Sequence, residues 1–219
     1  MQLFGLADIF PPPPAVFLKE LFPEIAVLYK SYYMSNTYIF LRHAETKKDP
    51  NRPAVEWVLA EDALLALQKH IDAEIFSEVE VIVTSTEEKA FATARPIIAT
   101  LDDIPVLRES QFNEVKRGDA FLTDEEFLTQ KKDQLTHLDR PIGGPESGEE
   151  ALQRFKDGLR ELEGQYQNKT ILIVSHGTIL SLYFAELLKK LSEVFDRWEQ
   201  LEFCAVGIVK DNQVVQDIV

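Results

Sequence analysis

The strongest constraint on the fold is a repeated alternation between short apolar runs and longer segments of helical character. The runs TYIFLR (37–42), VEVIVTS (79–85), IPVLR (104–108) and TILIVS (170–175) are rich in β-branched and aromatic residues, which is typical of buried strands. Strands that alternate with helices form mostly parallel sheets covered on both faces. The sequence therefore predicts an α/β fold: a mostly parallel central sheet with helices on both faces, a three-layer sandwich.

The intervening segments carry apolar residues at helical spacing. Such residues predict helices over 64–75, 152–166 and 179–187, and a further helix is expected from about Glu87 with a kink at Pro96. The polar segment 120–140 is also expected to be helical. Ser147 and Glu150 have the spacing of a capping box, so the helix over 152–166 should begin directly after Ser147.

The C-terminal segment predicts a hairpin. FCAVGIV (203–209) and VVQDIV (214–219) are joined by a polar stretch at 210–213 that suits a tight turn. We expect this pair to supply an antiparallel edge strand to the sheet.

The N-terminal residues have a different character from the rest. Four consecutive prolines, Pro11–Pro14, favour an extended segment without backbone donors. A chain of 219 residues is long enough for one sizeable α/β core and short for two. We therefore predict two parts: an N-terminal extension with a proline run over 1–33, of unknown role, and one catalytic domain over 34–219.

Charge and composition exclude several partner classes. The chain has 23 Lys and Arg against 37 Asp and Glu, a net charge of −14, which opposes binding to nucleic acid or to an anionic membrane. No apolar run reaches the roughly 18–20 residues of a membrane helix. The first residues lack a basic signal-peptide region, and the single Cys204 fits a reducing compartment, so a cytoplasmic location is expected.

Two of the four histidines follow predicted strands directly. Arg42 and His43 end the strand YIFLR, and His176 follows ILIVS. Ligands of open α/β sheets bind outside the carboxyl ends of the strands, so these side chains are candidates for one shared site. The other two histidines, His70 and His137, lie in polar helical surroundings, where exposure to solvent is expected.

This set of side chains suits phosphoryl transfer. A neutral imidazole can attack phosphorus and form a covalent intermediate, and Arg42 can hold phosphate oxygens with its planar guanidinium. A leaving alkoxide needs a proton from a carboxylic acid, and Glu109 follows the strand IPVLR at a suitable place. No clustered His or Cys pattern and no glycine-rich phosphate loop is present, so we expect no metal and no cofactor.

The motifs LRHAET and VSHGT together resemble the histidine phosphatase superfamily, which contains phosphoglycerate mutases and many small phosphatases. The resemblance covers residues 37–209 and implies a phosphoglycerate mutase-like fold. It also implies that His43 is the nucleophile, that Arg42 binds phosphate, and that His176 is the second histidine of the pocket.

The chain departs from the family pattern at several positions, including Asp49, near a place where asparagine is frequent. The family pattern S-x-x-x-R-A-x-x-T-A is matched except that Lys89 replaces the arginine, which retains the charge and loses the bidentate fork. Lys89 is therefore a predicted phosphate ligand, with an exposed helical residue as the alternative. Ala44 replaces a common glycine, which requires a negative φ there. The family's acid in L-x-E corresponds to Glu109, and Glu114 is the competing candidate because Asn113 replaces a glycine of that region.

The combined interpretation is a metal-independent phosphomonoesterase with a phosphohistidine intermediate. Its substrate would be a small phosphorylated metabolite or a phosphoprotein, and the side chains that select it are expected within 110–145. A mutase-like phosphotransferase is the first alternative, disfavoured because the segment between Glu109 and Glu146 shows no basic run for a second phosphate. A non-catalytic phosphate-binding protein is the second alternative. The sequence leaves the oligomeric state open.

Overall fold

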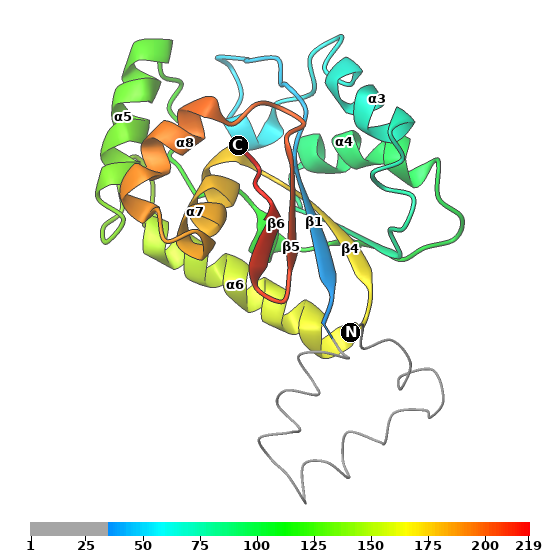
Figure 1. Ribbon diagram of the computed structural model, residues 1–219. Coiled ribbons are helices and arrows are strands. Elements are labelled where there is room, and N and C mark those ends of the chain that lie inside the picture. The colour runs from blue at the N-terminus through cyan, green and yellow to red at the C-terminus, as the bar shows by residue number, and fades with distance from the viewer. Residues whose placement is uncertain (1–34) are drawn as a thin grey trace, which may run out of the picture. The chain divides into compact units, whose positions relative to one another are not determined.

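The structure is a computed structural model that describes residues 35–219 (Figure 1). The predicted N-terminal extension over 1–33 lies outside the described residues. Residues Asn36–Val219 form a single unit, in which one sheet carries helices on both faces. The predicted α/β class and three-layer arrangement are confirmed.

Six strands form the sheet, in the order β3-β2-β4-β1-β5-β6. Their bounds are β1 Thr37–Arg42, β2 Val81–Thr84, β3 Val106–Arg108, β4 Thr170–Ser175, β5 Val206–Lys210 and β6 Gln213–Gln216. The pairs β1–β4, β2–β4 and β2–β3 are parallel, whereas β5 pairs antiparallel with β1 and β6 pairs antiparallel with β5. The antiparallel edge therefore consists of two strands, because the predicted hairpin joins the sheet as a unit.

The turn of this hairpin has the expected chemistry. Asp211 and Asn212 connect β5 to β6, and their φ angles are +54° and +58°. Two consecutive left-handed residues suit the twist of paired strands, and Asn and Asp tolerate this conformation better than most residues.

The helices follow the predicted pattern, with differences at their ends. The α-helices are α3 Leu65–Asp72, α4 Glu88–Ile98, α5 Asp124–Thr136, α6 Gly148–Gln165, α7 Gly177–Leu187 and α8 Val194–Gln200, and the 3-10 turns are η1 Ala54–Glu56, η2 Ser110–Phe112 and η3 Leu191–Glu193. The capping box of Ser147 and Glu150 is present at the start of α6, as predicted. Helix α3 ends before Ile75, since Glu74 adopts a φ of +56°, and α8 was not predicted.

Alternating side chains of β1 divide the core between the two faces. Phe40 packs with Phe155 of α6 and Phe184 of α7 in one apolar cluster. Leu41 belongs to the other cluster, with Leu67 of α3 and Ile97 of α4. Figure 1 shows α6 and α7 on one side of the sheet and α3 and α4 on the other. None of the described helices is both long enough and apolar enough to cross a membrane.

Candidate functional site

The two strand-end histidines lie next to each other. Strands β1 and β4 are adjacent and parallel, and their register pairs Arg42 with Ser175. The next residues, His43 and His176, therefore lie side by side at the carboxyl ends of the two strands. Their ring centroids are 5.0 Å apart, with an angle of 60° between the ring planes. The sheet topology thus brings together two side chains that are remote in sequence.

His43 is held as a neutral imidazole with one free nitrogen. Its Nδ1 lies 2.7 Å from the carbonyl oxygen of Ala44, so Nδ1 carries the proton and donates it, which leaves the lone pair on Nε2. Burial, together with the nearby His176 and Lys89, lowers the pKa of His43 well below its usual value. The ring is therefore uncharged at neutral pH, as a nucleophile must be.

The position after His43 tolerates an alanine. Ala44 is fully buried, and its N–H donates to Oγ1 of Thr93 at 2.9 Å. Among residues 35–219, Ala44 is not one of those with positive φ. The backbone conformation there consequently does not require the glycine that is common in the resembling family.

His176 is completely buried and also uncharged. Its Nε2 lies 2.7 Å from Oγ of Ser85, and its Nδ1 has no hydrogen-bond partner within the described part of the chain. Burial, reinforced by Lys89, lowers the pKa of His176 to about 3. The ring can therefore act as a neutral hydrogen-bonding group toward a ligand.

Arg42 is fixed against the end of the sheet. Its guanidinium lies over the ring of Phe203, 4.0 Å from the centroid, and donates to the carbonyl oxygen of Leu201. A Cβ at position 177 would lie 3.1 Å from Nε of Arg42, so Gly177 permits this close approach. Burial lowers the pKa of Arg42, but an arginine stays charged at neutral pH.

Lys89 is a buried part of the site and not an exposed helical residue. Its Nζ donates to the carbonyl oxygen of Ala54 at 2.8 Å and forms a salt bridge with Glu87, also at 2.8 Å. Only 6% of the residue is accessible to solvent. The structure therefore places a second cation beside the two histidines, at the position where the family pattern has arginine.

Glu87 is a residue of the site that the sequence did not predict, as is Lys131 below. One oxygen pairs with Lys89, and the other accepts from the backbone N–H of Glu114 at 3.0 Å and lies 3.4 Å from Nε2 of His176. Since His176 is neutral, this last contact is not an ion pair. Glu87 lies two residues after Ser85 and two residues before Lys89. This position inside the motif is the sequence feature that could have identified Glu87 as part of the site.

The two candidate acids differ sharply. The Glu114 carboxylate accepts from the N–H groups of Thr178 and Ile179 at the start of α7, at 3.0 and 3.1 Å. Burial raises its pKa, but Lys131 and the donated hydrogen bonds outweigh this effect and lower the pKa to about 2. Glu114 is thus ionised at neutral pH and unsuited to donate a proton.

Glu109 lies in a different environment, at the end of a strand and partly open to solvent. Its backbone N–H pairs with the carbonyl of Thr84 at 2.9 Å, which places it at the carboxyl end of β3. Its side chain is partly exposed and makes no hydrogen bond or salt bridge with the other described residues. Strands β2 and β4 separate β3 from β1, so Glu109 lies at the same edge of the sheet as the histidines but farther along it.

Another buried cation belongs to this region. Nζ of Lys131, from α5, donates to Oγ1 of Thr178 at 3.0 Å. Burial lowers its pKa to about 8, although Glu114 opposes the shift. Arg154, by contrast, is structural: its Nε pairs with Glu146 at 2.8 Å. Within residues 35–219, no group of three His, Cys, Asp or Glu side chains is arranged to hold a metal ion.

Comparison with known proteins gives a family match over most of the chain. The sequence model of the histidine phosphatase superfamily (branch 1) matches residues 38–214. A curated Bacillus subtilis protein, described as the uncharacterized phosphatase PhoE, is 30% identical over 108 residues. That alignment covers 49% of this chain and 53% of the relative, so it spans about half the length of each.

Solved structures share the fold at low sequence identity. YhfR of Bacillus stearothermophilus has a TM-score of 0.67 and 23% identity, covering 83% of this chain and 95% of that one. A mycobacterial glucosyl-3-phosphoglycerate phosphatase has a TM-score of 0.62 at 16% identity, covering 78% and 88%. A phosphoserine phosphatase from Entamoeba histolytica has a TM-score of 0.60 at 22% identity, covering 79% and 89%.

Proposed function

The chain belongs to the histidine phosphatase superfamily (branch 1), and on that premise we propose that it is a metal-independent phosphomonoesterase with a phosphohistidine intermediate. The proposal rests on the state of His43. Its Nδ1 donates a hydrogen bond to the carbonyl oxygen of Ala44, and its ring is neutral, with the lone pair of Nε2 free to attack phosphorus. The substrate class is a small phosphorylated metabolite or a phosphoprotein.

The reaction proceeds in two displacements. In the first, Nε2 of His43 attacks phosphorus, the P–N bond forms and the P–O bond to the leaving group breaks, while Glu109 donates a proton to the departing oxygen. In the second, Glu109 accepts a proton from water as the water attacks phosphorus. The P–N bond then breaks, and inorganic phosphate and neutral His43 are released.

The remaining residues stabilise charge on the phosphoryl group. Arg42 and Lys89 supply two positive charges in a buried site, where electrostatic interactions are stronger than in water. His176 adds a neutral hydrogen-bonding group. Lys89 offers a point charge in place of a guanidinium fork, so we expect it to orient phosphate less tightly than an arginine would.

The proposal is tested with p-nitrophenyl phosphate in the presence of EDTA. We expect release of inorganic phosphate, and we expect His43→Ala to reduce kcat by at least about a thousandfold, because the covalent route is lost. His137→Ala is the matched control, since His137 is an exposed histidine on α5's C-terminal end. Absence of turnover in the unaltered protein, or full activity of His43→Ala, would contradict the proposal.

The fate of the phosphoryl group separates the alternatives that the sequence left open. A phosphotransferase moves the group to a second substrate, and a non-catalytic binding protein leaves the ester intact. Incubation with a labelled phosphomonoester followed by acid and base treatment identifies phosphohistidine, which is labile in acid and stable in base. A label that survives acid would remove His43 from the nucleophilic role.

A further inference from the structure

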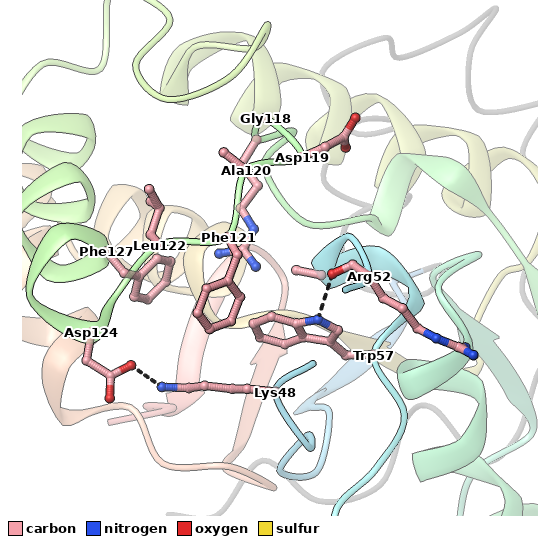
Figure 2. Close-up of a pocket in the computed structure, with 12 residues that line it drawn as sticks. Lys48, Arg52, Trp57, Gly118, Asp119, Ala120, Phe121, Leu122, Asp124 and Phe127 are labelled. Atoms are coloured by element: carbon pink, nitrogen blue, oxygen red, sulfur yellow. Dashed lines mark hydrogen bonds and ion pairs between the residues drawn. The ribbon is translucent and has the colours of Figure 1, made fainter. Parts of the chain in front are cut away.

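A cavity that the proposed chemistry does not use lies between the segment after β1 and the start of α5. Its lining comes from the segment after β1, which includes Lys48 and Trp57, and from the segment before α5 together with the first turn of that helix, which include Arg117, Phe121 and Phe127. Figure 2 shows the side chains of Trp57 and Phe121 next to each other in this lining.

Its walls are aromatic. The rings of Trp57 and Phe121 have centroids 6.5 Å apart at an angle of 55°. Phe121 is 46% exposed, so part of its ring is accessible to a ligand. A flat aromatic ring bound in this cavity could stack on Trp57 or on Phe121. Such stacking adds to the free energy of binding that comes from the buried apolar area alone.

The cavity also carries positive charge. The guanidinium of Arg117 lies 5.3 Å from the ring centroids of both Trp57 and Phe127. Lys48 and Arg52 also line the cavity, but Lys48 pairs with Asp124 and Arg52 lies 3.6 Å from a carboxylate oxygen of Asp49, so their charges are balanced. The cationic contact that the cavity offers to a bound ring is therefore the guanidinium of Arg117.

Two contacts connect the cavity to the site. The carbonyl oxygen of Ala54, a lining residue, accepts the hydrogen bond of Lys89 at 2.8 Å. On the other side, Nζ of Lys131 lies 5.6 Å from the ring centroid of Phe127 and bonds to Thr178, two residues after His176. Lys89 and the cavity thus share the segment around Ala54, and Lys131 contacts both Phe127 and the residue two positions after His176.

We propose that this cavity is the leaving-group subsite, and that the preferred substrates are phosphomonoesters of alcohols that bear a flat aromatic ring. The inference rests on the proposed phosphatase function and names its substrate class. The exposed Lys48–Asp124 ion pair connects the two parts of the chain that line the cavity, the segment after β1 and the start of α5 (Figure 2).

Turnover tests the subsite with two alkyl esters, phenethyl phosphate and n-butyl phosphate, whose leaving alkoxides are of similar basicity. We expect a lower KM for the aromatic ester. Phe121→Ala should raise that KM about tenfold and leave the KM of n-butyl phosphate within about twofold, because a stacking partner is removed. Leu128→Ala is the matched control, since Leu128 is 43% exposed on α5 and does not line the cavity.

Binding tests it independently of catalysis. The non-hydrolysable phenethylphosphonate and n-butylphosphonate are compared by calorimetry with the full chain. Tighter binding of the aromatic phosphonate, lost in Phe121→Ala and kept in Leu128→Ala, supports the subsite even if no ester is turned over, in which case only the proposed function fails. Turnover of both esters with equal KM, or equal loss of both in Phe121→Ala, overturns the subsite while the phosphatase function stands.

Discussion

At the scale of single residues, the unusual feature of the site is the buried pair of Glu87 and Lys89. A phosphate group brings negative charge to Lys89, but in the ligand-free protein Glu87 already neutralises that lysine at 2.8 Å. Both side chains are less than a tenth exposed, so solvent screens their interactions weakly. Glu87 therefore competes with phosphate for the same cation.

This competition predicts that Glu87→Gln binds inorganic phosphate more tightly. The amide keeps the size of the side chain and can still accept the N–H of Glu114, while the like charge is removed. We expect the inhibition constant of phosphate to fall about tenfold, equivalent to about 1.4 kcal/mol.

The control for this prediction is Glu88→Gln. Glu88 lies on the same helix, is about half exposed and pairs with Arg95, so its removal changes net charge equally without altering the pocket. An unchanged or larger inhibition constant in Glu87→Gln would show that Glu87 does not oppose phosphate.

At the scale of secondary-structure elements, the start of α7 organises the site. The helix begins immediately after His176, and its first N–H groups have no partners within the helix. Glu114, from the segment after β3, accepts two of them, and a negative charge at that end is favourable. One carboxylate thereby connects the segment after β3 to the helix that follows the second histidine.

This connection predicts acid sensitivity. The pKa of Glu114 is about 2 in the folded protein against 4.5 as its reference, so its contribution to stability is complete above pH 4.5 and is lost as the pH falls toward 2. Glu114→Gln should lower the free energy of unfolding by on the order of 3 kcal/mol near pH 7, and the difference from the unaltered protein should shrink between pH 4.5 and 2.

Denaturant titrations at several pH values measure this difference. Glu149→Gln, at an exposed position in the first turn of α6, is the control and should show little effect at any pH. A difference that stays constant from pH 7 to 2 would mean that the charge of Glu114 does not stabilise the fold.

At the scale of the whole molecule, residues Asn36–Val219 form one compact unit that contains both apolar clusters described above. The amide of Asn36 donates to the carbonyl of Tyr166 at 2.9 Å and accepts the N–H of Lys169 at 3.0 Å, which ties the start of β1 to the segment before β4. Asn36 thus anchors the start of β1 to the body of the domain.

We therefore expect a chain of residues 34–219 to fold and to act alone. Its melting temperature and its kcat/KM for p-nitrophenyl phosphate should equal those of the full chain within experimental error. A lowered melting temperature would instead assign residues 1–33 a packing role, and a lowered kcat/KM at equal stability would assign them a role in the site.

The sequence by itself determined the features that depend on local order. Strand and helix positions follow from hydrophobic periodicity, the start of α6 follows from Ser147 and Glu150, and the hairpin follows from its turn residues. The placement of His43 and His176 at strand ends was also visible, because parallel strands bring their carboxyl ends to one edge.

Only the tertiary structure determined which charged and aromatic side chains lie in contact with one another. The pairing of Glu87 with Lys89, the capture of Glu114 by α7 and the aromatic cavity around Trp57 each join segments distant in sequence or depend on side-chain orientation. The physical reason is that periodicity reports which face of an element is buried. Electrostatic and stacking interactions instead depend on distances of a few ångströms between side chains, and only the packed molecule sets those distances.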